Sequence, residues 1–200
     1  LSFVGLESVP IRHGVTLGEM LCWFFAQEGH ALGADGALSI LSSLGWERRH
    51  TALSWTRPFL APSPNMPTAE TALLYPGGCL IEGTNLSEGR GTAFPFRVIG
   101  APFLDGALLA SELRALSLPG LLVREAAFRP CFEKHAGQVC RGVMLHVTSA
   151  AKLRPVETFL SLIVLARCRL CSISAIAVSI SFAVTGPRNW RATLPSGAIR

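Results

Sequence analysis

The sequence predicts an α/β protein in which at least part of the sheet is parallel. Short apolar runs alternate along the chain with longer amphipathic stretches, which is the order of strands and helices that α/β folds use. Of the 200 residues, 50% are hydrophobic and 16% are charged. A chain of this size and composition can bury a sizeable core, so a disordered chain is not the default expectation.

The N-terminal part of the chain is predicted to hold a strand and one amphipathic helix. The apolar run 1–14 is broken by Gly and Pro, as expected for a strand that leaves a sheet into a loop. The helix is expected over 17–29, where apolar residues recur at helical spacing. Thr16 and Glu19 form a capping-box pattern, which marks the start of the helix.

A short element, a loop and a strand–helix pair are predicted next. Residues 37–46 are expected to form a short buried element, and the four prolines of 51–67 predict a loop. Residues 94–104 have the pattern of a strand that runs into a loop. Asp105 is expected to cap a helix over 106–116, because its carboxylate can accept from the free N–H groups of the first turn.

Two strands and a closing helix complete the predicted elements. The strands are expected over 120–130 and 142–149, which are short runs rich in apolar and β-branched residues. The helix is expected over 152–170, with Pro155 near its first turn, where proline is tolerated.

The net charge of +5 comes from the C-terminal tail rather than from the body of the chain. Residues 158–200 contain five arginines and no Asp, Glu or Lys, whereas residues 1–157 contain 13 basic and 13 acidic side chains. No basic stripe with interleaved aromatic residues is present, so binding to nucleic acid is not expected. The uncharged run 172–184 is too short for a membrane span, and six cysteines are too sparse for a disulfide scaffold.

Residues 79–92, CLIEGTNLSEGRGT, concentrate polar side chains in one stretch. Glu82 and Glu88 lie among glycines that let the backbone bend sharply. Cleavage of a glycosidic bond commonly uses two carboxyl groups, and Asn85 and Arg90 would then hold the sugar. The alternative is that the glutamates cap helix ends or pair with Arg90. The residues alone leave both interpretations open.

Three further polar residues lie on predicted loops. Asn65 belongs to the proline-rich run APSPNMPT, and His13 and His135 lie on predicted loops that are flanked by glycine. The prolines would fix the direction of the Asn65 side chain, and a histidine in a loop can act as an acid, a base or a ligand. Each of the three also fits an ordinary turn or surface residue, so they are secondary candidates for substrate contacts.

A zinc module is the alternative to a saccharide site, with Cys131, His135, Cys140 and His146 as its ligands. Structural zinc sites usually begin with a tight pair of cysteines, and this run has none. His146 also lies inside a predicted strand. The motifs of nucleotide-binding proteins and serine hydrolases are absent as well. We therefore expect neither a metal nor an organic cofactor.

Three blocks resemble those of a known enzyme family: SFVGLESVPIRHGVTLGEM, then PSPNMPTAETALLYPGGCLIEGTNLSEGRGTAFPFRVIGAPF, and then FEKHAGQVCRGVMLHVT. By these blocks the chain is identified as a member of the bacterial exo-β-N-acetylmuramidases. These are NamZ-type peptidoglycan hexosaminidases, formerly described as a domain of unknown function. The resemblance implies the tail end of a Rossmann-like domain over 1–60, truncated at the N-terminus, and a smaller α/β domain with the cleft motif over 61–170. Residues 171–200 depart from the family and are interpreted as an atypical tail, which a reading-frame shift would explain.

The resemblance implies a fragment of a glycoside hydrolase that releases N-acetylmuramic acid from the non-reducing ends of peptidoglycan fragments, with MurNAc-GlcNAc saccharides as ligands. Glu88 is then expected in an acid/base or orienting role, and Glu82 is the second catalytic candidate. Arg90 is expected to hold a substrate carboxylate, such as the lactyl group of muramic acid. The expected substrate-binding residues are Arg90, Asn85, Asn65, His13 and His135.

A binding protein without activity is the alternative to the hydrolase. The family's Pro-Glu-His-Gly motif, where a principal catalytic carboxylate is expected, is absent from the 200 residues. The chain would then be catalytically inactive and at most bind muropeptides. In either case the resemblance implies a place in the periplasm or outside the cell.

Overall fold

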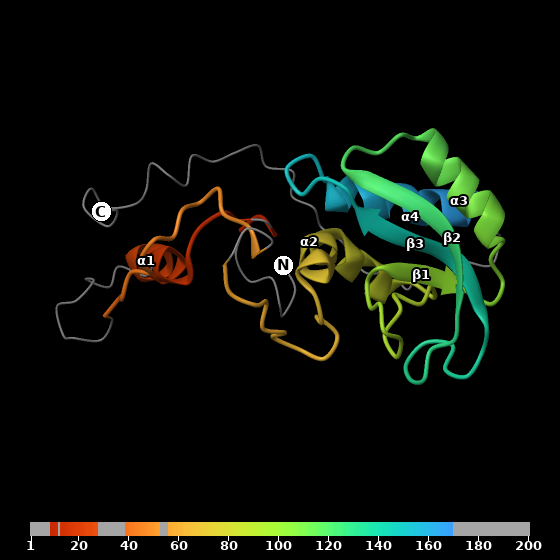
Figure 1. Cartoon of the computed structure of the whole chain (residues 1–200), viewed down its shortest axis with the longest axis horizontal. Helices are drawn as coiled ribbons and strands as arrows, with labels where there is room; N and C mark the ends of the chain where they lie inside the picture. Colours follow the sequence, from red (N-terminus) through yellow and green to blue (C-terminus); the bar gives the residue numbers. More distant parts are fainter. Residues whose placement is uncertain (1–8, 12, 28–38, 53–55, 170–200) are drawn as a thin grey trace. The chain divides into compact units, whose positions relative to one another are not determined.

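The chain forms two compact units (Figure 1). The computed structural model describes residues 9–11, 13–27, 39–52 and 56–169. Among these residues, the first unit ends at His50 and the second begins at Thr51. The predicted strand over 1–14 falls largely outside the described residues, and the tail over 171–200 falls outside them entirely.

The first unit contains the helix α1, Leu17–Gln27, and the predicted capping box at its start is confirmed. The backbone N–H of Thr16 donates to Oε2 of Glu19 at 2.8 Å, and the N–H of Glu19 donates to Oγ1 of Thr16 at 3.2 Å. Glu19 also pairs with Arg48, and this hydrogen bond lowers the pKa of the Glu19 carboxyl group.

The prediction of a buried element over 37–46 is wrong for the described residues 39–46. They form no helix or strand, and Leu41 and Leu44 are exposed. Gly45 has a φ of +70°, so the backbone turns there in the left-handed region and interrupts any regular element. The apolar run indicated burial, but the turn decides the local structure.

The second unit is built on a three-stranded sheet with the order β1-β3-β2. The strands are β1, Val98–Ala101, β2, Leu121–Phe128, and β3, Cys140–Val147. Both pairings are antiparallel, so the prediction of a partly parallel sheet is wrong for the described residues. β3 follows β2 through a loop without a helix, so it returns antiparallel and lies between β1 and β2 (Figure 1). β1 and β2 do run in the same direction, but they are not neighbours.

Three helices accompany the sheet and confirm the α/β class: α2, Ala69–Gly78, α3, Gly106–Ala115, and α4, Pro155–Arg169. The sequence predicted α3 and α4. The predicted cap of α3 is confirmed, since Oδ1 of Asp105 accepts from the N–H of Leu108 at 3.0 Å. Within the described part of the chain, no helix has the length and apolar character needed to cross a membrane.

Helix α2 was not predicted, because residues that usually interrupt helices lie inside it. Pro76 and Gly77 are both part of the helix. Its N-terminus is stabilised by Thr68, whose Oγ1 accepts from the N–H of Thr71 at 3.1 Å. From α2 the chain continues into η2, a 3-10 helix over Cys79–Gly83. The polar stretch 79–92 therefore begins in η2, and its remaining residues, 84–92, form the polar segment.

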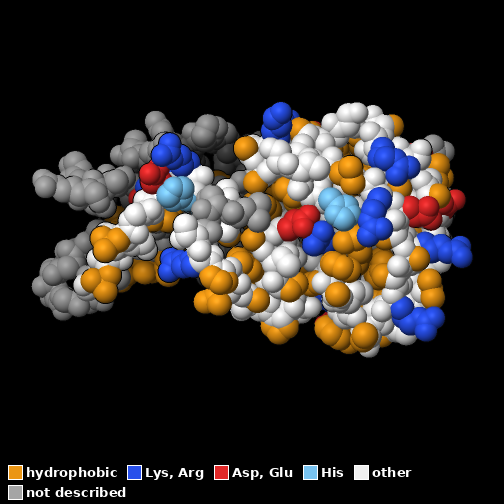
Figure 2. Space-filling view, viewed as in Figure 1, with side chains coloured by type: hydrophobic (Ala, Val, Ile, Leu, Met, Phe, Trp, Pro, Cys, Tyr) orange, Lys and Arg blue, Asp and Glu red, His pale blue; other side chains and the backbone are white. Residues whose placement is uncertain are grey.

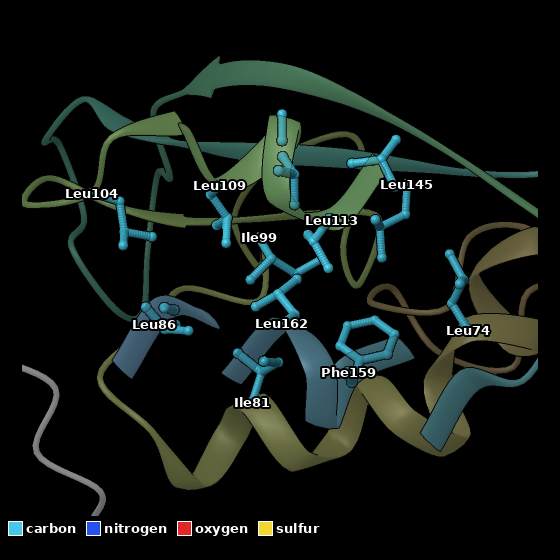
Figure 3. Close-up of a cluster of buried hydrophobic side chains, with 14 of the residues drawn as sticks. Leu74, Ile81, Leu86, Ile99, Leu104, Leu109, Leu113, Leu145, Phe159 and Leu162 are labelled. Atoms are coloured by element: carbon cyan, nitrogen blue, oxygen red, sulfur yellow. The ribbon is translucent and has the colours of Figure 1, made fainter. Parts of the chain in front are cut away.

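One hydrophobic core joins the helices and strands of the second unit (Figure 3). α3 packs on β2 and β3, and α4 packs on α2 and α3. The fully buried side chains of the core include Leu74, Ile81, Ile99, Leu145 and Phe159. Gly77 permits the close approach of α2 and α4, because a Cβ there would lie 2.1 Å from the carbonyl oxygen of Pro155. The core therefore fixes η2 and β1, which precede and follow the polar segment 84–92.

Candidate functional site

The polar segment 84–92 lies beside the strand β1 and is held there by its backbone. The N–H of Ser87 donates to the carbonyl oxygen of Gly100 at 2.8 Å. The N–H of Gly100 donates in return to the carbonyl oxygen of Ser87 at 3.1 Å. This bridge fixes the segment relative to the sheet and its core.

The hydroxyl side chains of the segment bond to its own backbone. Oγ1 of Thr84 donates to the carbonyl oxygen of Ile81 at 2.8 Å. Oγ of Ser87 accepts from the N–H of Gly89 at 3.2 Å, and Oγ1 of Thr92 donates to the carbonyl oxygen of Gly89 at 2.6 Å. Local bonds of this kind stabilise tight turns. These hydroxyls therefore maintain the shape of the segment.

Two glycines make the turns of the segment possible. Gly89 has a φ of +81°, and a Cβ there would lie 2.6 Å from the carbonyl oxygen of Val98. Gly91 has a φ of +77°, and a Cβ there would lie 2.7 Å from the backbone nitrogen of Phe132. A side chain at either position would meet both strain and a clash. The sharply bent backbone predicted from the glycines is confirmed.

Glu82, Glu88 and Arg90 form one charged cluster. Nη2 of Arg90 lies 2.5 Å from Oε1 of Glu82, and Nε of Arg90 lies 3.3 Å from Oε1 of Glu88. The Glu88 side chain is 4% exposed, whereas the Glu82 side chain is 38% exposed. Glu82 is therefore the carboxylate that solvent or a ligand reaches, and Arg90 links it to the buried one.

Burial and the charges of the cluster shift the pKa values of Arg90 and of two neighbouring groups, Tyr75 and Cys79. Burial alone would lower the pKa of Arg90, but the hydrogen bond with Glu82 and the charges of both glutamates raise it. Burial and the charge of Glu82 raise the pKa of the Tyr75 hydroxyl and of the Cys79 thiol. At neutral pH, Arg90 is therefore a cation, and Tyr75 and Cys79 keep their protons.

Lys134, which the sequence did not mark as a site residue, completes the cluster. Its Nζ lies 3.0 Å from Oε2 of Glu88. It also donates to the carbonyl oxygens of Ile81, Glu82 and Leu86, at 3.0, 3.1 and 3.1 Å. An ammonium group has three N–H donors, so these four acceptors satisfy it fully. Its partners lie 46 to 53 positions away in the sequence, so no local pattern reveals this role.

His135 and Asn85 meet beside the same cluster. Nε2 of His135 lies 2.7 Å from the carbonyl oxygen of Asn85, so this nitrogen carries the proton and donates it. His135 has a φ of +59°, and the buried Phe96 has a φ of +60°. The N–H of Phe96 donates to the carbonyl oxygen of Glu88 at 2.6 Å. Positive φ strains residues other than glycine, and such strain is concentrated at functional sites.

Asn65 and His13, the other two predicted site residues, lie outside this cluster. Asn65 lines a pocket of about 770 Å³ whose lining does not include Glu82, Glu88 or Arg90. His13 belongs to the first unit, where its Nδ1 accepts from the N–H of Val15 at 3.2 Å. The site residues that the structure brings together are Glu82, Asn85, Glu88, Arg90 and His135. Their roles in binding and catalysis stay predictions.

The structure does not gather Cys131, His135, Cys140 and His146 into a zinc site. Over the described ranges, no three His, Cys, Asp or Glu side chains are grouped so as to hold a metal ion. Cys131 is exposed and Cys140 is buried. His146 lies on β3, in the strand predicted for it.

A second group of charged side chains, separate from the charged cluster, consists of Glu70, Arg97, His146 and Arg124. Figure 2 shows acidic, basic and histidine side chains side by side on one face of the second unit. Nη2 of Arg97 lies 2.9 Å from Oε2 of Glu70 and 3.5 Å from Nδ1 of His146. Nε of Arg124 donates to Nε2 of His146 at 3.0 Å. Burial lowers the pKa of His146, the charges of the two arginines lower it further, and Glu70 opposes them weakly. A neutral His146 is also what the hydrogen bond from Arg124 requires.

We expect His146→Gln to weaken the pH dependence of stability. The folded chain protonates His146 less readily than the unfolded chain, so its contribution to stability is complete above the unfolded-state pKa of about 6.5 and is lost as the pH falls below it. Urea unfolding at about pH 7.5 and about pH 5.5 measures the change. The free energy of unfolding should fall less in H146Q than in the unmodified chain. His50→Gln in the first unit is the control, and an equal fall in both variants would contradict the prediction.

We expect Lys134→Met to lower the free energy of unfolding by about 3 kcal/mol. The substitution leaves the buried Glu88 carboxylate and three carbonyl oxygens without their shared donor. Urea unfolding followed by circular dichroism measures this loss. Lys152→Met is the matched control, because Lys152 is exposed and the substitution removes the same ammonium group. Equal stability of the two variants would show that Lys134 does not hold the segment.

Two family models match the chain. The model of exo-beta-N-acetylmuramidase NamZ, N-terminal, matches residues 1–70, and the model of exo-beta-N-acetylmuramidase NamZ, C-terminal, matches residues 73–183. The charged cluster falls within the C-terminal match. The two family models meet between residues 70 and 73, whereas the two compact units of the structure divide between residues 50 and 51. The domain boundary predicted at 60/61 stays a prediction.

A named relative supports the same family. The chain is 45% identical over 162 residues to peptidoglycan beta-N-acetylmuramidase NamZ of Bacillus subtilis (strain 168). The alignment covers 81% of this chain and 38% of that protein, so the chain spans less than half the length of this relative.

Two solved structures of DUF1343 family proteins from Bacteroides fragilis NCTC 9343 resemble the chain in fold. One has a TM-score of 0.72 at 23% identity and covers 80% of this chain and 42% of that chain. The other has a TM-score of 0.55 at 26% identity and covers 80% of this chain and 40% of that chain. Because the C-terminal family model alone matches residues 73–183, more than half of the 200, the chain belongs to the exo-β-N-acetylmuramidase NamZ family.

Proposed function

We propose that this chain is part of a glycoside hydrolase that acts on peptidoglycan fragments. On this proposal, the reaction releases N-acetylmuramic acid from the non-reducing ends of the fragments. Family membership supports the reaction class, and the clustered carboxylates in the matched segment support the location of the site. Because peptidoglycan lies outside the cytoplasmic membrane, we propose that the protein works in the periplasm or outside the cell.

The observation that carries the proposal is the pair of carboxylates, Glu82 and Glu88, held by one arginine. Hydrolysis of a glycosidic bond needs a group that transfers a proton and a second group that stabilises the sugar cation or activates water. Carboxylates on a rigid support perform both tasks in many glycosidases. The bridge to β1 and the hydrogen bonds of Lys134 supply that support here.

The different burial of the two glutamates separates their proposed roles. Glu82 is 38% exposed and lies at the surface of the cluster, so we assign it the contact with substrate. Glu88 is 4% exposed and receives both Arg90 and Lys134, so we assign it the orienting role. Two cationic donors hold a carboxylate in one position, which suits a group that orients others.

Arg90 is assigned a positioning role, because its guanidinium is paired with the Glu82 carboxylate. Its guanidinium already contacts the carboxylates of Glu82 and Glu88 and lies over the ring of Phe96, with 5.2 Å between Cζ and the ring centroid. We therefore propose that Arg90 positions Glu82. A ligand carboxylate would then need a cation at another place in the chain.

A binding function without hydrolysis is the second candidate, and the same ion pairs favour it. Both Glu82 and Glu88 accept from cationic donors, whereas cleavage also requires a group that donates a proton to the leaving oxygen. The proton donor of a hydrolase would then come from outside this cluster. In its absence the chain would bind muropeptides without cleaving them.

We expect Glu82→Gln to lower the rate of sugar release about a hundredfold or more, because it removes the reachable carboxylate and preserves its shape. The assay follows release from a chromogenic N-acetylmuraminide by the full 200-residue chain. Circular dichroism confirms that the variant is folded. Glu157→Gln on α4 is the matched control, because Glu157 is exposed and belongs to another surface.

The results separate the two candidates. Release by the unmodified chain that falls in E82Q but not in E157Q supports the hydrolase. Binding of the disaccharide without any release supports the binding function. Equal release by both variants would remove Glu82 from the mechanism. The absence of both binding and release in the unmodified chain would overturn both candidates.

A further inference from the structure

The outer face of the sheet, opposite the core, carries a pocket that the charged cluster does not use. Side chains alternate across a strand, so Ile99, Val123 and Leu145 face the core, and the residues beside them face outward. The register places Met144 opposite both Val98 and Arg124. These three outward side chains form a continuous floor across all three strands.

Loops from three parts of the chain surround this floor. The pocket has a volume of about 770 Å³, which is in the range of sites for small ligands. Its walls include Asn65 from the proline-rich loop, Thr92 at the end of the polar segment, Phe94 just after it, and Phe128 and Phe132 around the end of β2. Aromatic rings and one amide are a common lining for the apolar faces and the acetamido group of a sugar.

Arg124 provides a cation at this pocket that has no carboxylate partner among the described residues. Arg90 pairs with Glu82 and Glu88, and Arg97 pairs with Glu70. The partners of Arg124 are neutral: Nε donates to Nε2 of His146 at 3.0 Å, and Nη2 lies 2.9 Å from Sδ of Met144. A guanidinium has five N–H donors, so three remain for a ligand.

The held orientation of Arg124 distinguishes it from an ordinary surface arginine. His146 and Met144 contact the guanidinium from the neighbouring strand β3, while the group itself remains exposed. Glu125 also lines the pocket but is the next residue along β2, so its side chain leaves the sheet on the opposite face. Arg129 lines the pocket as well and adds to its positive charge.

We propose that Arg124 binds a carboxylate of a ligand whose apolar part and sugar ring occupy this pocket. A planar guanidinium with free donors matches a carboxylate in two places. The identity of the ligand rests on the proposed function: in peptidoglycan fragments, the carboxylate comes either from the lactyl group of a peptide-free muramic sugar or from an attached peptide. The site therefore selects muramic over glucosamine saccharides.

Calorimetric titration of the full chain tests the proposal with three ligands. N-acetylmuramic acid carries the lactyl carboxylate, N-acetylglucosamine lacks it, and N-acetylmuramoyl-L-alanine moves the carboxylate to the amino acid. We expect Arg124→Gln to weaken binding of N-acetylmuramic acid at least about tenfold and to leave N-acetylglucosamine unchanged. Arg124→Lys keeps the charge but loses the planar fork. Its affinity for N-acetylmuramic acid should therefore lie between that of R124Q and that of the unmodified chain.

Arg141→Gln is the matched control, because Arg141 is exposed on β3 but does not line the pocket. It should bind all three ligands as the unmodified chain does. Equal binding of both N-acetylmuramic acid and N-acetylmuramoyl-L-alanine by R124Q and R141Q would overturn the proposal. Sensitivity of N-acetylmuramoyl-L-alanine to R124Q would assign the site to the peptide carboxylate, and sensitivity of N-acetylmuramic acid alone would assign it to the lactyl group.

A sugar-free probe separates this proposal from the proposed function. D-lactate should shift the NMR signal of the Arg124 Nε–H, and the shift should be absent in R124Q. A lactate shift without binding of any saccharide would keep the carboxylate site and reject peptidoglycan as its source. Saccharide binding that is insensitive to R124Q, with no lactate shift, would reject the site and leave the proposed function intact.

Discussion

The buried carboxylate of Glu88 is the constraint on which the site depends. A charge with 4% exposure is stable in a folded protein only when other groups replace the water that it has lost, and Arg90 and Lys134 do so here. Lys134 lies in the loop between β2 and β3. Its ammonium group also donates to carbonyl oxygens of η2 and of the polar segment, and so holds the two together. Arg90 extends the same network outward to Glu82. One buried charge thus determines where the reachable carboxylate lies.

The segment 88–92 connects the two proposed parts of the site. Glu88 and Arg90 belong to the charged cluster, while Gly91 and Thr92 line the pocket on the outer face of the sheet. The absence of side chains at Gly89 and Gly91 lets this short stretch pass between Val98 on one side and Phe132 on the other. A ligand in the pocket would therefore rest against the backbone that Glu88 holds in place. Catalytic and selective groups can share one support in this way.

The sequence predicted those features that depend on local chemistry. The caps at Thr16 and Asp105, the place of Pro155 in the first turn of α4 and the bends at the glycines all arise within a few residues, and the structure confirms them. Features that depend on distant partners were missed. Nothing near Lys134 in the sequence shows that its ammonium will meet Glu88, and the alternation of strands and helices did not show that β3 would enter between β1 and β2. Helix α2 was missed for the opposite reason, because tertiary packing on α4 overrides the helix-breaking character of Pro76 and Gly77.

The most direct measurement is a double-mutant cycle on Glu88 and Lys134, with Glu88→Gln, Lys134→Met and the double variant compared in urea unfolding. If the buried charge organises the segment, the two substitutions remove the same interaction, and the double variant should be more stable than the sum of the single losses implies. A coupling free energy of about 1.5 kcal/mol or more is the expected result for a close pair in one network. Additive losses would contradict the central role of Glu88, because they would mean that each side chain stabilises the fold independently.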